Sequence, residues 1–222
     1  MTADKKSKVS ESVTYGEQSV NQEYVMPDFI YDTDLSKPAL LLHSCCGPCS
    51  TAVVEELIRD YKITVYFYNP NITDEAEYKK RLESQMKFID EYNGKISRID
   101  TIEFIEGVYE PGYFLDEVRG LEHEPEGGER CVKCFRLRLE KTAGMARLGG
   151  YDFFAAALSV SPHKNYRAIS EAGRDLSLRY GVGFIDRDYK KNGGYERSIE
   201  LSKLYSLYRQ NYCGCKFSKG EK

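Results

Sequence analysis

The stretch from Leu40 to Ser50 constrains the fold more than any other part of this 222-residue chain. It reads L-L-L-H-S-C-C-G-P-C-S, so an apolar run ends in a tight turn that carries two adjacent cysteines and a third one three residues later. A continuous apolar run is typical of a strand buried on both faces of a parallel sheet. Pro48 suits the first turn of a following helix. We therefore expect a strand, a turn and a helix that present the cysteines at the strand end.

The rest of the chain alternates short apolar runs with segments of helical periodicity. We expect further strands at residues 63–68, 98–104, 152–158 and 183–186, and helices at residues 51–60, 73–93, 131–148, 166–180 and 196–209. Strands that alternate with helices predict an α/β fold, an open and mainly parallel five-stranded sheet with helices on both faces. Segment 106–129 is punctuated by Gly and Pro, and we expect a long loop with short helical pieces, which is typical of a functional loop.

The two ends of the chain fall outside this alternation. Residues 1–34 are polar and aperiodic, and we interpret them as an N-terminal tail. Residues 35–222 then form a single α/β domain. After its last helix this domain ends in an arm that carries Cys213 and Cys215.

Charge and hydropathy exclude several classes of protein. The formal net charge of −3 argues against a protein that coats nucleic acid by bulk charge, although it allows a local basic face. No apolar run approaches membrane-spanning length, and we find no signal peptide. We therefore expect a reducing, cytoplasmic location. There, clustered cysteines are metal ligands or redox centres more often than structural disulfides.

All seven cysteines fall in three short clusters, which a scatter of structural thiols would not produce. They are the turn described above, a C-x-x-C pair and a C-x-C pair: Cys45, Cys46 and Cys49, then Cys131 and Cys134, then Cys213 and Cys215. Ligands of open parallel sheets bind beyond the carboxyl ends of the strands. The loops that carry the clusters share this edge, so we expect them to meet at one inorganic site.

Four thiolates are the usual complement of a [4Fe–4S] cluster or a closed zinc site. Adjacent side chains on an extended backbone diverge, so a vicinal pair suits two iron corners of a cluster better than one zinc ion. The expected cluster ligands are Cys45, Cys46, Cys131 and Cys134. The other three, Cys49, Cys213 and Cys215, hold a second metal, or the last two cycle between dithiol and strained disulfide. The alternative is a structural zinc site with spare thiols.

Polar residues that follow the strands are candidate substrate contacts. They are Asn69 and Asn71 after the second strand, His163, Lys164 and Asn165 after the fourth, and Asp186 and Tyr189 after the fifth. A helix start such as that at Lys164 suits a phosphate or ribose. A local basic rim is expected from Arg130, Arg136, Arg138, Lys164, Arg167, Lys190, Lys191 and Arg209. Each residue also has a plain structural interpretation, as a strand end, a helix cap or a solvated face.

Five stretches, in this order, carry a resemblance to one family. They are H-S-C-C-G-P-C-S, then Y-N-P-N-I followed by E-Y-K-K-R, then G-E-R-C-V-K-C-F-R-L-R-L, then L-S-V-S-P-H-K-N, and last Y-R-Q-N-Y-C-G-C-K-F-S. From about Ala39 to Ser218 the chain resembles the QueH-type epoxyqueuosine reductases of tRNA queuosine synthesis. The resemblance implies a Rossmann-like fold related to the PP-loop (HUP) enzymes, a [4Fe–4S] cluster and an adjacent iron ion.

The resemblance also implies a reaction. It is a two-electron reduction of the epoxide of epoxyqueuosine at the tRNA wobble position, which gives queuosine and water and needs an external low-potential electron donor. The iron would act as a Lewis acid on the epoxide oxygen. The acid that protonates this oxygen is unassigned, with His43, Tyr68 and Asp186 as candidates.

The resemblance assigns roles to individual cysteines as well. Cys45, Cys46, Cys131 and Cys134 match the cluster ligands. Cys213 and Cys215 match a terminal pair used for redox chemistry or for the second metal. Some relatives carry an aspartate where this chain has Cys49, so the ligands of a second iron stay open.

Two other functions compete with this interpretation. A PP-loop-like tRNA-modifying enzyme would need a Gly/Ser-rich pyrophosphate loop after the first strand, where this chain has Cys-Cys-Gly-Pro-Cys. A zinc-stabilised, non-catalytic binding module would be colourless after anaerobic purification, whereas an iron–sulfur protein would be brown. No motif identifies the electron donor, the oligomeric state or the role of the tail.

Overall fold

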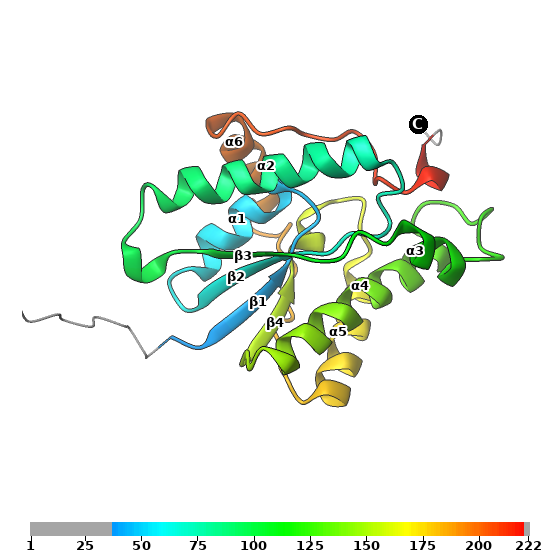
Figure 1. Ribbon diagram of the computed structural model, residues 1–222, viewed down its shortest axis with the longest axis horizontal. Coiled ribbons are helices and arrows are strands. Elements are labelled where there is room, and N and C mark those ends of the chain that lie inside the picture. The colour runs from blue at the N-terminus through cyan, green and yellow to red at the C-terminus, as the bar shows by residue number, and fades with distance from the viewer. Residues whose placement is uncertain (1–36, 220–222) are drawn as a thin grey trace, which may run out of the picture. The chain divides into compact units, whose positions relative to one another are not determined.

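A five-stranded, wholly parallel sheet forms the centre of the structure, a computed structural model that describes residues 37–219 (Figure 1). The strands are β1 (Ala39–His43), β2 (Lys62–Phe67), β3 (Glu103–Glu106), β4 (Phe153–Ala156) and β5 (Gly183–Phe184), in the order β3-β2-β1-β4-β5. The predicted α/β, Rossmann-like class is confirmed. The predicted tail, residues 1–34, lies outside the described residues.

Strand β1 is the middle of the sheet, and its apolar run follows from this position. Leu41 pairs with Thr64 of β2 on one side and with Phe154 of β4 on the other. Leu40, Leu41 and Leu42 have no exposed surface, because helices cover both faces of the strand. Each leucine side chain buried in this way contributes about 1.5–3 kcal/mol to the free energy of unfolding.

Six α-helices accompany the sheet in residues 37–219 (Figure 1). One face carries α1 (Gly47–Leu57), α2 (Glu75–Asn93) and α6 (Gly194–Leu204), the other carries α4 (Glu129–Leu148) and α5 (Tyr166–Tyr180), and the short α3 (Pro111–Glu117) lies between β3 and α4. Leu40 and Leu42 belong to the apolar core on the α1 side of the sheet, and Leu41 belongs to the core on the α4 side. This follows because successive side chains of a strand point to opposite faces of the sheet. None of the helices described is both long and apolar enough to cross a bilayer.

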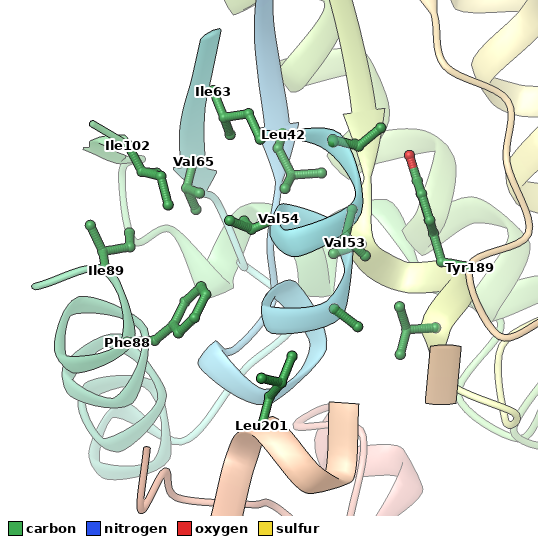
Figure 2. Close-up of a cluster of buried hydrophobic side chains, with 14 of the residues drawn as sticks. Leu42, Val53, Val54, Ile63, Val65, Phe88, Ile89, Ile102, Tyr189 and Leu201 are labelled. Carbon is green, nitrogen blue, oxygen red and sulfur yellow. The ribbon is translucent and has the colours of Figure 1, made fainter. Parts of the chain in front are cut away.

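The core on the α1 side joins the sheet to three helices. Figure 2 shows Val53 and Val54 of α1 among side chains of the sheet, α2 and α6, including Leu42, Phe88 and Leu201. The start of α1 is pressed against α2. A Cβ atom at Gly47 would lie only 2.5 Å from the carbonyl oxygen of Ser84, so the glycine of the C-C-G-P-C turn is required by packing.

Several boundaries differ from the predicted ones for local reasons. Helix α2 begins after Asp74 rather than Thr73, because the Asp74 carboxylate accepts hydrogen bonds from the N–H groups of the next turn at 3.0 and 3.2 Å. Strand β3 begins only at Glu103, since a 3-10 turn occupies Arg98–Asp100. The last helix ends at Leu204, and the chain then turns at Ser206 with a φ of 49°.

Candidate metal centre and active site

A cavity of about 330 Å³ opens beyond the carboxyl end of β1. Three segments that are distant in sequence line it: the turn after β1, residues 158–164 after β4, and residues 209–213 after α6. The chain leaves β1 through α1 on one face of the sheet and continues to β2. It leaves the neighbouring strand β4 through α5 on the other face and continues to β5, in the opposite direction along the sheet. The cavity therefore lies at the switch point where parallel sheets bind their ligands.

The turn after β1 brings three thiols together. The Sγ atoms of Cys45, Cys46 and Cys49 lie within 4.8 Å of one another, and those of Cys45 and Cys46 are 3.9 Å apart. The expectation that the vicinal thiols diverge is therefore wrong, because the chain bends from β1 into α1 at this pair. Among residues 37–219, no other group of three metal-ligating side chains is as tightly gathered. The group formed by the turn thiols includes Cys49, which we had not expected among the cluster ligands.

A buried polar network supports this turn from below. The Oε1 atom of Gln85 accepts hydrogen bonds from Ser44 Oγ at 2.6 Å and from Ser50 Oγ at 3.0 Å. The side-chain amide of Asn69 donates to the carbonyl oxygen of Ser44 at 2.9 Å. These groups are at most 1 % exposed, so the bonds exchange poorly with water and hold the turn in one conformation.

The C-x-x-C pair lies in the first turns of α4. Cys131 Sγ accepts a hydrogen bond from the backbone N–H of Gly127 at 3.2 Å. Cys134 is buried in a small apolar cluster with Cys215 and with Phe114 of α3. The predicted functional loop 106–129 contains the short helix α3, as the expected helical pieces require, and this helix covers one cysteine from each of two clusters.

The C-terminal C-x-C arm folds back over the end of β2. The Arg81 guanidinium donates to the carbonyl oxygens of Cys213 and Tyr212 at 3.0 and 3.1 Å, and Thr73 N–H donates to that of Gly214 at 3.2 Å. Gly214 has a φ of 102°, and a Cβ atom there would lie 2.9 Å from Ile72. Only glycine fits this conformation and this contact without strain.

Three cationic side chains face the thiols. Lys164 Nζ lies 2.9 Å from Cys213 Sγ and 3.3 Å from a carboxylate oxygen of Glu126. Arg81 interacts electrostatically with Cys46 and Cys45. Arg138, which is buried on α4, interacts with thiols of all three clusters, namely Cys134, Cys213, Cys45 and Cys131. Thiols of the first and third clusters line the cavity, and Arg138, which also lines it, connects them electrostatically to Cys131 and Cys134, so the surroundings favour negative charge on sulfur.

Burial and these cations divide the thiols by acidity. Hydrogen bonds with Cys46 and Cys49 hold the pKa of Cys45 well below its ordinary value. Burial raises the pKa of Cys134 to about 12. Burial would also raise the pKa of Cys213, but Lys164 and Arg138 outweigh it and lower this pKa. Metal binding would displace the remaining thiol protons, because the thiolate is the ligand form.

The predicted substrate contacts separate into two groups. His163 and Lys164 line the cavity. Asn165 instead caps α5, since its Oδ1 atom accepts from Ala168 N–H at 3.3 Å. Asp186 follows β5 and accepts hydrogen bonds from side chains of α5, so it connects the strand to that helix. Tyr189 is buried in the core on the α1 side of the sheet. The residues lining the cavity do not include these last three.

The predicted residues at the ends of β1 and β2 are buried. Asn71 is 1 % exposed, and its Oδ1 atom has no partner among the described residues. His43 Nε2–H donates to the carbonyl oxygen of Tyr68 at 2.9 Å. Burial, followed by the charge of Arg138, lowers the pKa of His43 to about 4, so the ring is neutral. The Tyr68 hydroxyl donates to Glu110 at 2.6 Å.

Sequence reasoning missed three cavity residues. Arg81 holds the arm, Tyr212 packs under the Arg81 guanidinium, and Gln210 donates to Cys46 Sγ at 3.0 Å. All three lie inside stretches that carry the family resemblance, which was the available signal. Local periodicity could not reveal them, because their partners are more than 100 residues away in the chain.

The donor set fits a metal that prefers sulfur. Thiolates select zinc, Cu(I) and iron–sulfur clusters, whereas magnesium and calcium prefer oxygen. Buried cations around the thiols favour a bound unit of net negative charge. A [4Fe–4S] cluster held by four thiolates is such a unit.

Comparison with known proteins identifies relatives along nearly the whole domain. The family model described as epoxyqueuosine reductase QueH matches residues 40–221. Proteins of this name are 43 % identical in Streptococcus pyogenes serotype M1, covering 90 % of this chain and 79 % of the relative, and 43 % identical in Staphylococcus epidermidis, covering 90 % and 85 %. The protein of this name from Thermotoga maritima is 35 % identical, covering 81 % and 89 %.

Proposed function

Since the chain belongs to the epoxyqueuosine reductase QueH family, we propose that it is the oxidoreductase that converts epoxyqueuosine in the tRNA anticodon loop to queuosine. Two electrons and two protons enter the substrate. Both C–O bonds of the epoxide break, a C=C bond forms, and the oxygen leaves as water. An external low-potential donor supplies the electrons. Residues 35–222 act as one catalytic domain in the reducing cytoplasm.

One observation carries this proposal. The buried Arg138 guanidinium lines a cavity at the sheet's switch point together with Cys45, Cys49 and Cys213, and it interacts electrostatically with thiols of all three cysteine clusters. A binding module that needed zinc only for folding would use four thiols. It would not need a further pair of thiols, one of which, Cys213, lies 2.9 Å from the half-buried Lys164 at the wall of an open cavity.

We assign the [4Fe–4S] cluster to Cys45, Cys46, Cys131 and Cys134. When bound, the cluster and an adjacent iron supply electron transfer and Lewis acidity toward the epoxide oxygen. The remaining thiols, Cys49, Cys213 and Cys215, hold the adjacent iron or, for the last two, form a redox pair. The close grouping of Cys49 with Cys45 and Cys46 makes the division among the turn thiols the first point to test.

The protein's own side chains bind and orient the substrate. The cavity wall offers the aromatic ring of Tyr212 for a flipped base, as is common in single-stranded RNA recognition. His163 and Lys164 offer donors to a ribose or phosphate. Arg138 is only 1 % exposed and does not contribute to the basic rim, whereas Arg209 is exposed at the cavity mouth.

Anaerobic purification tests the proposal. We expect brown protein that contains iron and sulfide. It should reduce the epoxide of a modified anticodon stem-loop when a chemical reductant supplies the electrons. Colourless protein that holds zinc alone would instead support a zinc-stabilised binding module. Iron-containing protein that leaves the epoxide intact would contradict the assigned reaction.

A further inference from the structure

Three arginines are buried in this small domain, each with at most 2 % of its surface exposed. Two of them are partnered by oxygen atoms. Arg81 forms an ion pair with Glu77 at 2.6 Å and donates to two carbonyl oxygens of the arm. Arg130 donates to the carbonyl oxygens of Leu121, Glu122 and Glu124, and so it ties the loop before α4 together.

Arg138 differs from both. Its Nε–H donates to the carbonyl oxygen of one residue, Cys134, at 3.3 Å, and its Nη2 atom, like the Nε atom of Arg130, is buried without a hydrogen-bond partner among the described residues. No carboxylate in the described part of the chain lies within ion-pair distance of it. It lines the cavity together with Cys45 and Cys213, and its electrostatic partners are the thiols of Cys134, Cys213, Cys45 and Cys131.

A buried charge without a counter-charge is costly, and proteins retain one where a ligand or a reaction uses it. The thiols around Arg138 become anionic when they hold a metal. A cluster with four thiolate ligands carries net negative charge, and this charge grows when the cluster is reduced. A cation fixed beside it stabilises the reduced form more than the oxidised one, which raises the reduction potential.

We propose that Arg138 is the internal counter-cation of the metal centre, a positioning residue that retains the bound cluster and raises its reduction potential. This inference rests on the proposed function in that it takes the bound group to be an anionic thiolate–metal unit. Arg138 touches neither tRNA nor the epoxide in this assignment. Lys164 does not duplicate the role, because Glu126 already neutralises part of its charge.

Redox titration of the loaded full-length protein tests the proposal directly. We expect Arg138→Met to lower the midpoint potential and to lose iron to a chelator several-fold faster than wild type, while Arg138→Lys stays close to wild type in both. Arg130→Met is the matched control, since it removes an equally buried guanidinium whose partners are carbonyl oxygens. It should lower the thermal midpoint without moving the potential. An unchanged potential and unchanged iron loss in Arg138→Met would overturn the proposal.

Thermal unfolding of metal-free protein separates this inference from the function it rests on. Without an anion beside it, the Arg138 charge has no counter-charge, so metal-free Arg138→Met should be at least as stable as metal-free wild type. Metal-free Arg130→Met should be less stable than wild type. Equal destabilisation by both substitutions would make Arg138 a structural residue and overturn the proposal. Wild-type protein that never holds iron would instead overturn the proposed function, and the metal-free comparison would still decide the role of Arg138.

Discussion

The two walls of the cysteine cavity are built in different ways. The turn that carries Cys45, Cys46 and Cys49 lies between the central strand and a buried helix start, with Gln85 fixing it from below. The opposite wall is the arm from Ser206 to Cys215, which contains no helix or strand. It is held to the body by side-chain hydrogen bonds in place of regular secondary structure, among them those of Arg81, Gln210 and Lys164.

This difference suits the chemistry proposed for each wall. Ligands that must keep one geometry are best placed on rigid, buried elements. A pair of thiols that changes state in each turnover, or that must admit a substrate, suits a segment of lower local stability. The comparison therefore predicts that changes in the turn affect the metal content, whereas changes in the arm affect turnover.

The largest effect is expected from the turn. Cys45→Ala should lose nearly all iron and sulfide, because it removes the most acidic thiol of the rigid group. Cys49→Ala should keep the cluster. Quantification of iron and sulfide after anaerobic reconstitution measures both. A cluster that survives in Cys45→Ala and disappears in Cys49→Ala would move Cys49 into the ligand set.

The arm should respond in the opposite manner. The double substitution of Cys213 and Cys215 by Ser should retain the brown colour and abolish epoxide reduction, since these thiols are additional to the four assigned to the cluster. A redox pair should be trapped as a disulfide after one turnover without reductant, whereas a metal site should lose iron beyond the cluster's own. Turnover at the wild-type rate by the double variant would remove these residues from the mechanism.

A smaller effect is expected from the backbone of the arm. Gly214→Ala should slow turnover markedly while the cluster is retained, because the new methyl group meets Ile72 and the positive φ adds about 1–3 kcal/mol of local strain. Gly120→Ala is the matched control. It has a φ of 85° with nothing within 4 Å of its Cβ position, so it carries similar strain away from the cavity. Equal losses of turnover in the two variants would show that general strain, not the arm, is responsible.

The smallest effect concerns tRNA affinity. Arg209 lies in the arm and lines the cavity, so Arg209→Gln should weaken binding of the anticodon stem-loop a few-fold and reduce the magnitude of the salt slope by about one. Arg136→Gln is the control, since Arg136 is exposed on α4 and paired with Asp175. This substitution should change neither the affinity nor the salt slope. Binding that is indifferent to ionic strength in the wild type would exclude a basic rim of any composition.

The sequence alone was sufficient to predict a parallel sheet and to single out the three cysteine clusters. The run Leu40–Leu42 predicts a strand covered on both faces, and its burial confirms this, because strand period and apolar content are local properties. The three cysteine clusters are likewise local patterns. The turn after β1 and the connection from β3 to α4 both start at the carboxyl edge of the parallel sheet, whereas the arm with Cys213 and Cys215 follows a helix, and only the fold places it there.

The tertiary structure decided how the polar groups are paired. Asp186 follows a strand, as a substrate contact would, yet its carboxylate is occupied by Tyr166, Ser170 and Arg174. Periodicity shows which residues face the interior, but not which partner a buried charge meets there, because partners come from distant segments. Arg130 and Arg138 lie eight residues apart on one helix, α4. Only the folded chain shows that the first guanidinium donates to three carbonyl oxygens, while the second lines the cavity with Cys45 and Cys213.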